Sequence, residues 1–337
     1  MKIDYIDPQK KEGVFVWEAD VLFFPRRSSD EFSGKSEQDV CQELKWKYGE
    51  SSLCFPSMRR EDAFLVWVAK IGEWDSQKET KVSFNIPERK SYQDPESGNT
   101  ISVFDFSREV TGRKQLKENF SFSSYKAKIA PDGREVEEYD TGSSLYRKYT
   151  KSESRIGKTE SIVELAREVS AKEDDSLGKA KRLYEWVTEN VARRKGVGKR
   201  KITRVFEERE GTPEEVSLLL VVLLRAIGIP ARLVSGAQGE RRQELHSWAE
   251  FYVENDGWVP VDCAKGLFGE IDSQRVIFSK GENILLERAP ENSVVFDIRY
   301  KRALSLCPEA VYIDSKEEGF FVVRKSKYLV LKDSTDK

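Results

Sequence analysis

The sequence is poor in the residues that most often build metal sites and nucleophilic sites. Its 337 residues include a single histidine, His246, and four cysteines with no Cys-x-x-Cys pair among them. One histidine and dispersed cysteines cannot form a zinc site of the usual kind, and no glycine-rich phosphate loop follows an expected strand. We therefore expect neither a metal nor a cofactor.

Long apolar runs are also missing. No segment approaches 18 consecutive apolar residues, and the first 20 residues hold no apolar run of signal-peptide length. We interpret the scattered cysteines as reduced thiols, most simply small buried hydrophobes. The cysteines are Cys41, Cys54, Cys263 and Cys307. Reduced thiols and the missing apolar runs together predict a cytoplasmic protein without membrane contact.

An excess of charge of either sign is absent as well. The 57 basic and 59 acidic residues leave a net charge of −2, so no overall field favours nucleic acid. Six of the nine residues 193–201 are basic, but no aromatics are interleaved, which indicates a solvated loop more than an anion site. The charged fraction of 34% with only two methionines fits a thermophilic source or a well-solvated surface.

What the first part of the chain does contain is a series of short segments rich in Val, Phe, Ile and Trp. Some alternate apolar with polar residues, and turn residues separate them, which predicts a β-sandwich of about 140 residues. Residues 36–48 are a helical candidate. The expected strands are 14–24, 63–71, 81–86, 101–106 and 119–129.

From Thr159 the apolar residues recur with a period near 3.6, which predicts two amphipathic helices. The first carries a stripe at Ile162, Leu165, Ala166 and Val169; the second begins near Asp175 and Ser176. A third helix, 213–227, is apolar on nearly every side and therefore belongs inside a core. Strands are expected at 231–236, 246–254 and 258–262, so the fold class is α+β with a buried central helix on an antiparallel sheet.

Two stretches within this second part carry a family resemblance: GTPEEVSLLLVVLLRAIGIPARLVSGA and LHSWAEFYVENDGWVPVDCA. They resemble the transglutaminase-like core that is shared with papain-type cysteine hydrolases. In that family a Gly-x-Cys opens the buried helix, and His-x-Trp-Ala-Glu and Gly-Trp-Val-Pro-Val-Asp strands follow. The resemblance covers residues 159–290. It implies a catalytic triad at positions 213, 246 and 262, which here hold Pro213, His246 and Asp262.

The resemblance also suggests how the chain is divided. We expect a β-sandwich-like domain at 1–150, a transglutaminase-like core at 151–300 and a C-terminal β extension packed on that core at 301–337. Bacterial members of the family are often exported, and the missing signal-like segment departs from that habit.

Proline at position 213 conflicts with catalysis. Cysteine hydrolysis needs a thiolate at a helix N-terminus, an imidazole to take its proton and a carboxylate to orient the imidazole. Pro213 has no side-chain heteroatom and no backbone N–H for an oxyanion hole. It does suit the first helical position, because Thr212 and Glu215 form a T-x-x-E capping box around it. His246 and Asp262 then read as remnants of a triad.

Three functions follow from this pattern. The one we favour is a pseudoenzyme that binds a protein or peptide partner, with Trp248, Trp258 and the loop 237–245 around a residual groove. An active cysteine-type hydrolase or acyltransferase would need an unaligned nucleophile, such as Cys263 or Thr212. Cys263 follows Asp262 on a strand and should therefore point to the opposite face. The third is a purely architectural module.

Overall fold

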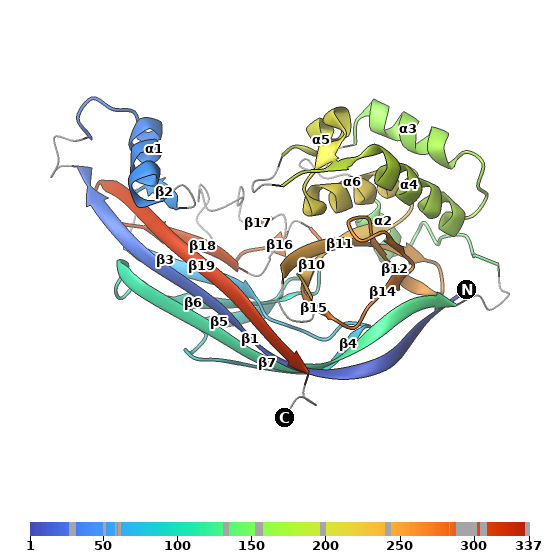
Figure 1. Cartoon of the computed structure of the whole chain (residues 1–337), viewed down its shortest axis with the longest axis horizontal. Coiled ribbons are helices and arrows are strands. Elements are labelled where there is room, and N and C mark those ends of the chain that lie inside the picture. Colours follow the sequence, from blue (N-terminus) through green and yellow to red (C-terminus); the bar gives the residue numbers. More distant parts are fainter. Residues whose placement is uncertain are drawn as a thin grey trace.

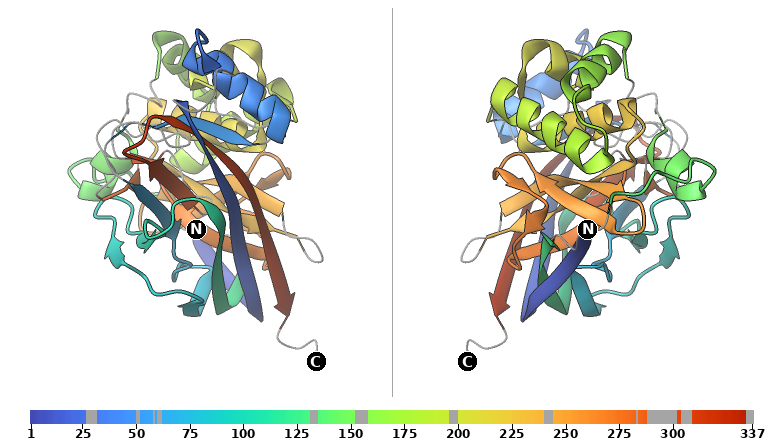
Figure 2. Two further views of the ribbon diagram at one scale, coloured as in Figure 1. Left: turned by 90° about the vertical axis from the view of Figure 1, so that its left-hand side faces the viewer. Right: turned by 90° about the vertical axis from the view of Figure 1, so that its right-hand side faces the viewer.

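The chain folds into a mixed α+β structure in which the helices, a central sheet and a set of long strands lie over one another (Figure 1, Figure 2). The computed structural model describes residues 1–26, 32–49, 52–57, 59, 62–130, 135–151, 158–195, 200–239, 244–282, 284–287, 302–303 and 309–333. The helices between residues 160 and 226 lie on one side of the central sheet, and the long strands run along its other side to the end of the molecule that carries the first helix, Glu37–Tyr48.

Strands from the first 130 residues, with three from the later part of the chain, form two antiparallel sheets that bury one core between them, as the sandwich-like expectation predicts. The larger sheet contains β2 (Leu53–Pro56), β19 (Gly319–Asp333), β1 (Lys2–Pro25), β7 (Gly112–Ala130), β14 (Glu270–Ile271) and β4 (Gln77–Phe84). The smaller sheet contains β18 (Glu309–Asp314), β3 (Ala63–Ala69), β6 (Thr100–Asp105) and β5 (Lys90–Gln93). Their shared core includes Trp17, Phe64, Trp67, Phe104 and Phe120.

Strand β1 begins twelve positions before the strand that the sequence predicts at 14–24. The residues before position 14 are largely polar, so no apolar alternation marks them as a strand. They are held by register, since β7 pairs with β1 from Lys2 to Val21 across a bulge between Ile6 and Gln9. Pairing with the long strand β7 therefore keeps the polar start of β1 in a strand conformation that its own side chains do not predict.

The C-terminal strands correct the expected position of residues 301–337. They were expected on the transglutaminase-like core, but β19 pairs with β1 from Lys11↔Asp333 to Pro25↔Gly319, and β18 pairs with β3. The apolar residues Phe321 and Val323 alternate along β19 and join the sandwich core. The sandwich is therefore completed by the last part of the chain, and the boundary at 150 stays a prediction.

The cysteines correct a second expectation. Cys41 of α1 (Glu37–Tyr48) and Cys54 of β2 form a disulfide instead of two reduced thiols. Disulfides are typical of oxidising compartments and also occur in intracellular proteins of hyperthermophiles. Cys307 lies outside the described residues.

The second half contains the helices and the central sheet. The helices are α2 (Ser144–Tyr149), α3 (Glu160–Ser170), α4 (Ser176–Asn190), α5 (Ile202–Glu208) and α6 (Pro213–Ala226). The central sheet has the order β13 (Leu267–Phe268), β12 (Gly257–Asp262), β11 (Glu244–Val253), β10 (Ala231–Gln238) and β15 (Arg275–Lys280). Two short pairs complete it: β8 (Ala192–Arg193) with β9 (Glu210–Gly211), and β16 (Ile284–Leu285) with β17 (Arg302–Ala303).

Helix α6 occupies the middle of this half, as its apolar sequence predicts. Every residue from Glu215 to Arg225 is buried, and the helix packs on β10 and β11 and against α3, α4 and α5. Gly228 follows with φ of +82°, a left-handed conformation that glycine adopts without strain, and Pro230 comes two residues later. The predicted capping of α4 is also present, because the Asp175 side chain accepts the Gly178 N–H at 2.8 Å.

Two amide side chains join the sandwich to the central sheet by imitating strand pairing. The Gln77 amide donates to the Ile277 carbonyl at 3.2 Å and accepts the Ile277 N–H at 2.9 Å. Asn99 does the same at Lys280, at 2.7 and 2.9 Å. Strand β14 also pairs directly with β7. The two halves are therefore bound through buried main-chain groups of β15.

Candidate functional site

The start of α6 forms the capping box that the sequence predicts. The Glu215 N–H donates to Thr212 Oγ1 at 3.3 Å, and the Thr212 N–H donates to Glu215 Oε2 at 2.9 Å. Pro213 occupies the first helical position, where its missing N–H costs nothing because that position has no intrahelical acceptor. The position that the resemblance assigns to the nucleophile is thus a well-formed helix start.

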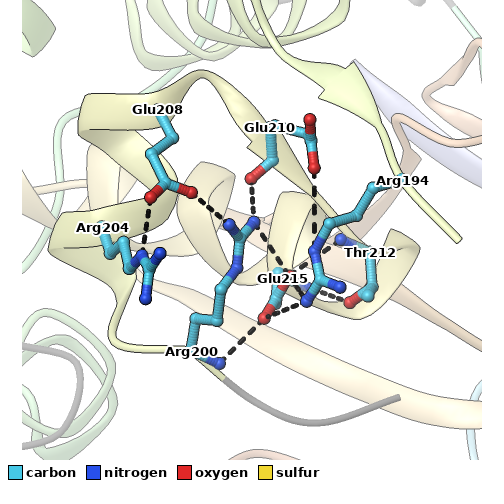
Figure 3. Close-up of polar contacts among 7 residues, drawn as sticks. All are labelled: Arg194, Arg200, Arg204, Glu208, Glu210, Thr212 and Glu215. Atoms are coloured by element: carbon cyan, nitrogen blue, oxygen red, sulfur yellow. Dashed lines mark hydrogen bonds and ion pairs between the residues drawn. The ribbon is translucent and has the colours of Figure 1, made fainter. Parts of the chain in front are cut away.

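A group of charged residues surrounds this helix start (Figure 3). The carboxylate of Glu215 accepts the Arg200 N–H at 2.8 Å and lies 3.2 Å from Nη2 of Arg194. Burial opposes ionisation of Glu215, but hydrogen bonds from Thr212 and Arg200 outweigh it and lower the pKa of this carboxyl. The basic segment 193–201 was expected to be solvated, and its ends are instead bound to α6; residues 196–199 lie outside the described part.

The remaining two triad positions are in contact. Nε2 of His246 lies 2.7 Å from Oδ2 of Asp262, and the two residues are 7% and 1% exposed. His246 lies on β11 and Asp262 ends β12, the neighbouring strand of the central sheet. The resemblance therefore locates a real pair of side chains.

A third side chain, which no sequence motif singled out, completes this cluster. Nη1 of Arg275, which is 4% exposed, donates to the same Oδ2 of Asp262 at 2.7 Å. Burial opposes ionisation of Asp262, yet hydrogen bonds and charge from His246 and Arg275 lower the pKa of its carboxyl. Arg275 lies on β15, which reaches the cluster because β15 pairs with β10 across the sheet. No local sequence pattern marks such a contact.

The first turn of α6 lies beside the strand that carries His246. The Ser217 hydroxyl is 2.9 Å from the carbonyl oxygen of Pro213 and 3.1 Å from that of Ser247. Ser247 directly follows His246 on β11. One buried hydroxyl thus bridges the start of the helix and the histidine strand, so the fold brings the three predicted positions into one region.

The alternative nucleophiles fit their structural roles better than chemistry. Cys263 is buried in the helix-side core, and burial followed by the charge of Asp262 raises the pKa of its thiol, which disfavours the thiolate. Thr212 is occupied as the helix cap. In the described part of the chain, the imidazole of His246 has Asp262 as its hydrogen-bond partner and no Cys, Ser or Thr.

The two tryptophans that were expected around a groove differ in their burial. Trp248 is completely buried, which corrects its expected place on a binding surface. Trp258 is half-buried and packs on Tyr149 and Tyr252, with the guanidinium of Arg232 3.7 Å from its ring centroid. Of the loop 237–245, residues 240–243 lie outside the described part.

The described ranges contain no group of three or more His, Cys, Asp or Glu side chains that could hold a metal ion. In the same ranges no helix is both long and apolar enough to cross a membrane.

The comparison with protein families decides what this site belongs to. Residues 163–263, which include α6, His246 and Asp262, match the model of the transglutaminase-like superfamily. This chain contains a transglutaminase-like core. That match takes in the capping box, the His–Asp pair and the strands that carry it, and it ends at Cys263.

Two relatives match this chain over short stretches. The chain is 35% identical over 108 residues to the uncharacterized protein YebA of Bacillus subtilis, which is 28% of this chain and 14% of that protein. It is 29% identical over 147 residues to an uncharacterized protein of Haemophilus influenzae, covering 35% of this chain and 40% of that one. The chain thus spans less than half the length of either relative.

One solved structure matches nearly the whole molecule. It is described as a proposed cysteine protease from Cytophaga hutchinsonii, with a TM-score of 0.63 and 11% sequence identity. The match covers 99% of this chain and 94% of that one. At this identity the likeness concerns the fold alone. The transglutaminase-like core and the long-stranded sandwich therefore occur together in another protein.

Proposed function

We propose that this protein is a transglutaminase-like pseudoenzyme, a module that stabilises a fold or binds a protein or peptide without acyl-transfer turnover. The observation that carries the proposal is Pro213 at the first position of α6, inside a complete capping box. In a catalytic version of this core the same position supplies the thiolate.

The physical argument has two parts. Proline offers no nucleophile, and it also lacks the amide that a cysteine at this position would offer to an oxyanion. Loss of one such donor costs about 3 kcal/mol of transition-state stabilisation. No described side chain takes over, because Thr212 is a cap and the Cys263 thiol is buried with a raised pKa.

Between the two roles of a pseudoenzyme, the burial of the site favours a structural one. Trp248 and Asp262 are enclosed, so neither can contact a peptide as the cluster stands. Ser217 links α6 to β11, and Asp262 of β12 bonds His246 of β11 and Arg275 of β15, so the cluster joins four elements. The competing function is a cysteine-type hydrolase or acyltransferase that uses Cys263 or Thr212.

The decisive experiment compares the wild type with Pro213→Cys. Both proteins are treated with iodoacetamide and with a hydroxyl-directed fluorophosphonate, and the modified residue is identified by mass spectrometry. We expect labelling at position 213 of the variant, because the α6 dipole favours a thiolate at its N-terminus. We expect no labelling of Cys263 or Thr212 in the folded wild type.

The control is Pro213→Ser, which keeps the helix start and adds no thiol. It should behave as the wild type does towards iodoacetamide. Fast modification of Cys263 or Thr212 in the wild type would overturn the proposal, because it would reveal a working nucleophile.

A further inference from the structure

The two carboxylate oxygens of Asp262 have different hydrogen-bond partners. Oδ2 lies 2.7 Å from Nε2 of His246 and 2.7 Å from Nη1 of Arg275, whereas Oδ1 accepts the Lys265 N–H at 3.2 Å. His246 and Arg275 therefore meet at one oxygen atom, and all three side chains are almost completely buried. Two groups that can both be cationic converge on a single negative charge.

This sharing conflicts with the task of the carboxylate in a catalytic triad. There the carboxylate orients the imidazole and stabilises the imidazolium that forms during the reaction. Arg275 is always protonated and already neutralises the charge of Asp262. A proton on His246 would place a second cation beside Arg275 in a buried site, where water and salt screen charges poorly.

Arg275 is fixed in this position from several sides. Its guanidinium stands over the Trp248 ring at 5.0 Å, and Nε lies 3.3 Å from Oδ2 of Asp272. Its main chain pairs with Gln238 at the end of β10. A buried guanidinium held by a ring, two carboxylates and a strand cannot turn away from Asp262 without disrupting the sheet.

We propose that Arg275 is a positioning residue that takes up the charge of Asp262 and so withholds it from a protonated His246. The inference rests on the proposed function, since it adds a second loss of catalytic capacity to the one at position 213. His246 would then be a weaker proton acceptor in a chain that already lacks the nucleophile. Restoring a cysteine alone would not restore a triad.

Because His246 is the only histidine, its ring can be followed by NMR without assignment. The imidazole is titrated in the wild type, Arg275→Gln and Arg275→Lys. We expect protonation in Arg275→Gln at a pH about one unit higher than in the wild type, the usual effect of removing one neighbouring like charge. Arg275→Lys, which keeps the charge, should stay close to the wild type. A glutamine variant that titrates with the wild type overturns the proposal.

A second variant guards against misfolding of Arg275→Gln. The half-exposed Asp272 shares Arg275 with Asp262, so Asp272→Asn leaves the whole guanidinium charge to Asp262. The imidazole of this variant should protonate at a lower pH than that of the wild type. A titration that is the same as in the wild type would contradict the proposal. The other titratable groups that interact with Asp262, Tyr184 of α4 and the neighbouring Cys263, are the same in all of these variants.

These titrations need no nucleophile and therefore fail independently of the proposed function. Labelling of wild-type Cys263 would remove the pseudoenzyme proposal and leave the role of Arg275 to be read from the NMR. Equal titration of wild type and Arg275→Gln would remove the role of Arg275 while position 213 still lacked a nucleophile.

Discussion

At the scale of single residues, the structure is most informative where a side chain is buried and polar. Asp262 and Glu215 both stay ionised below the surface because cations and N–H groups surround them, and in both the pKa is lowered. Glu118 of β7 is the opposite case. It is completely buried, its one hydrogen-bond donor among the described residues is the Ile71 N–H at 3.0 Å, and burial raises the pKa of its carboxyl to about 8.

The raised pKa of Glu118 predicts a loss of stability at alkaline pH. The folded pKa lies above the unfolded one, so the contribution of the protonated carboxyl is complete below about pH 4.5 and lost as the pH rises through about 8. Each unit of difference corresponds to about 1.4 kcal/mol. Urea titrations should show the unfolding free energy of the wild type falling across this range.

Glu118→Gln should remove much of that fall, because an amide can still accept the Ile71 N–H and does not ionise. The matched control is Glu109→Gln, at a carboxylate that is 80% exposed, and it should keep the pH dependence of the wild type. A wild-type stability that does not fall between pH 5 and 9 would contradict the burial of an ionisable group at this position.

At the scale of elements, the positions of the helices follow from caps and apolar stripes, whereas the joining of the sheets depends on side chains. Helices α3, α4 and α6 begin within one residue or so of their predicted starts, because Asp175 and Thr212 are strong N-caps and the stripes are clear. The contacts of Gln77 and Asn99 with β15 had no such signal, since no local pattern shows whether an amide side chain will meet a distant strand.

Asn99→Ala tests this joint. The substitution leaves the buried N–H and carbonyl of Lys280 without their partners, which costs about 1–3 kcal/mol for each group left unsatisfied. Chemical denaturation should show a loss of about 2 kcal/mol or more. Asn85→Ala is the matched control: Asn85 bonds Lys117 at an exposed position, where water can replace it, and the loss should be below about 1 kcal/mol. Equal losses of unfolding free energy in the two variants would show that the Asn99–Lys280 contact does not stabilise the protein.

At the scale of the whole molecule, strands from the two ends of the chain pair with each other. Strand β19 pairs with β1, and β7 belongs to the sandwich but also pairs with β14, which follows the central-sheet strands β12 and β13 in the chain. Met1, Ile3 and Ala127 of the long strands even belong to the core of the helices. The two halves share backbone pairing and apolar contacts, which is not the arrangement of two domains on a linker.

Shared strands predict that the two halves unfold together. In urea, the loss of strand signal in circular dichroism should coincide with the loss of the folded NMR signal of His246, which reports on the core alone. A transition of His246 at a separate urea concentration would show that the core unfolds independently. Unfolding in the presence of a reductant gives the control, since it also removes the constraint of the Cys41–Cys54 disulfide on α1.

The sequence by itself determined the α+β class, the transglutaminase-like core, the buried helix with its capping box and the His246–Asp262 pair. These are set by short-range patterns: caps, periodicity and motifs of adjacent residues. Only the tertiary structure decided that β19 belongs to the sandwich, that Cys41 meets Cys54, that Trp248 is enclosed and that Arg275 reaches Asp262. Each of these depends on which strands become neighbours, and strand order arises from packing between residues far apart in the chain.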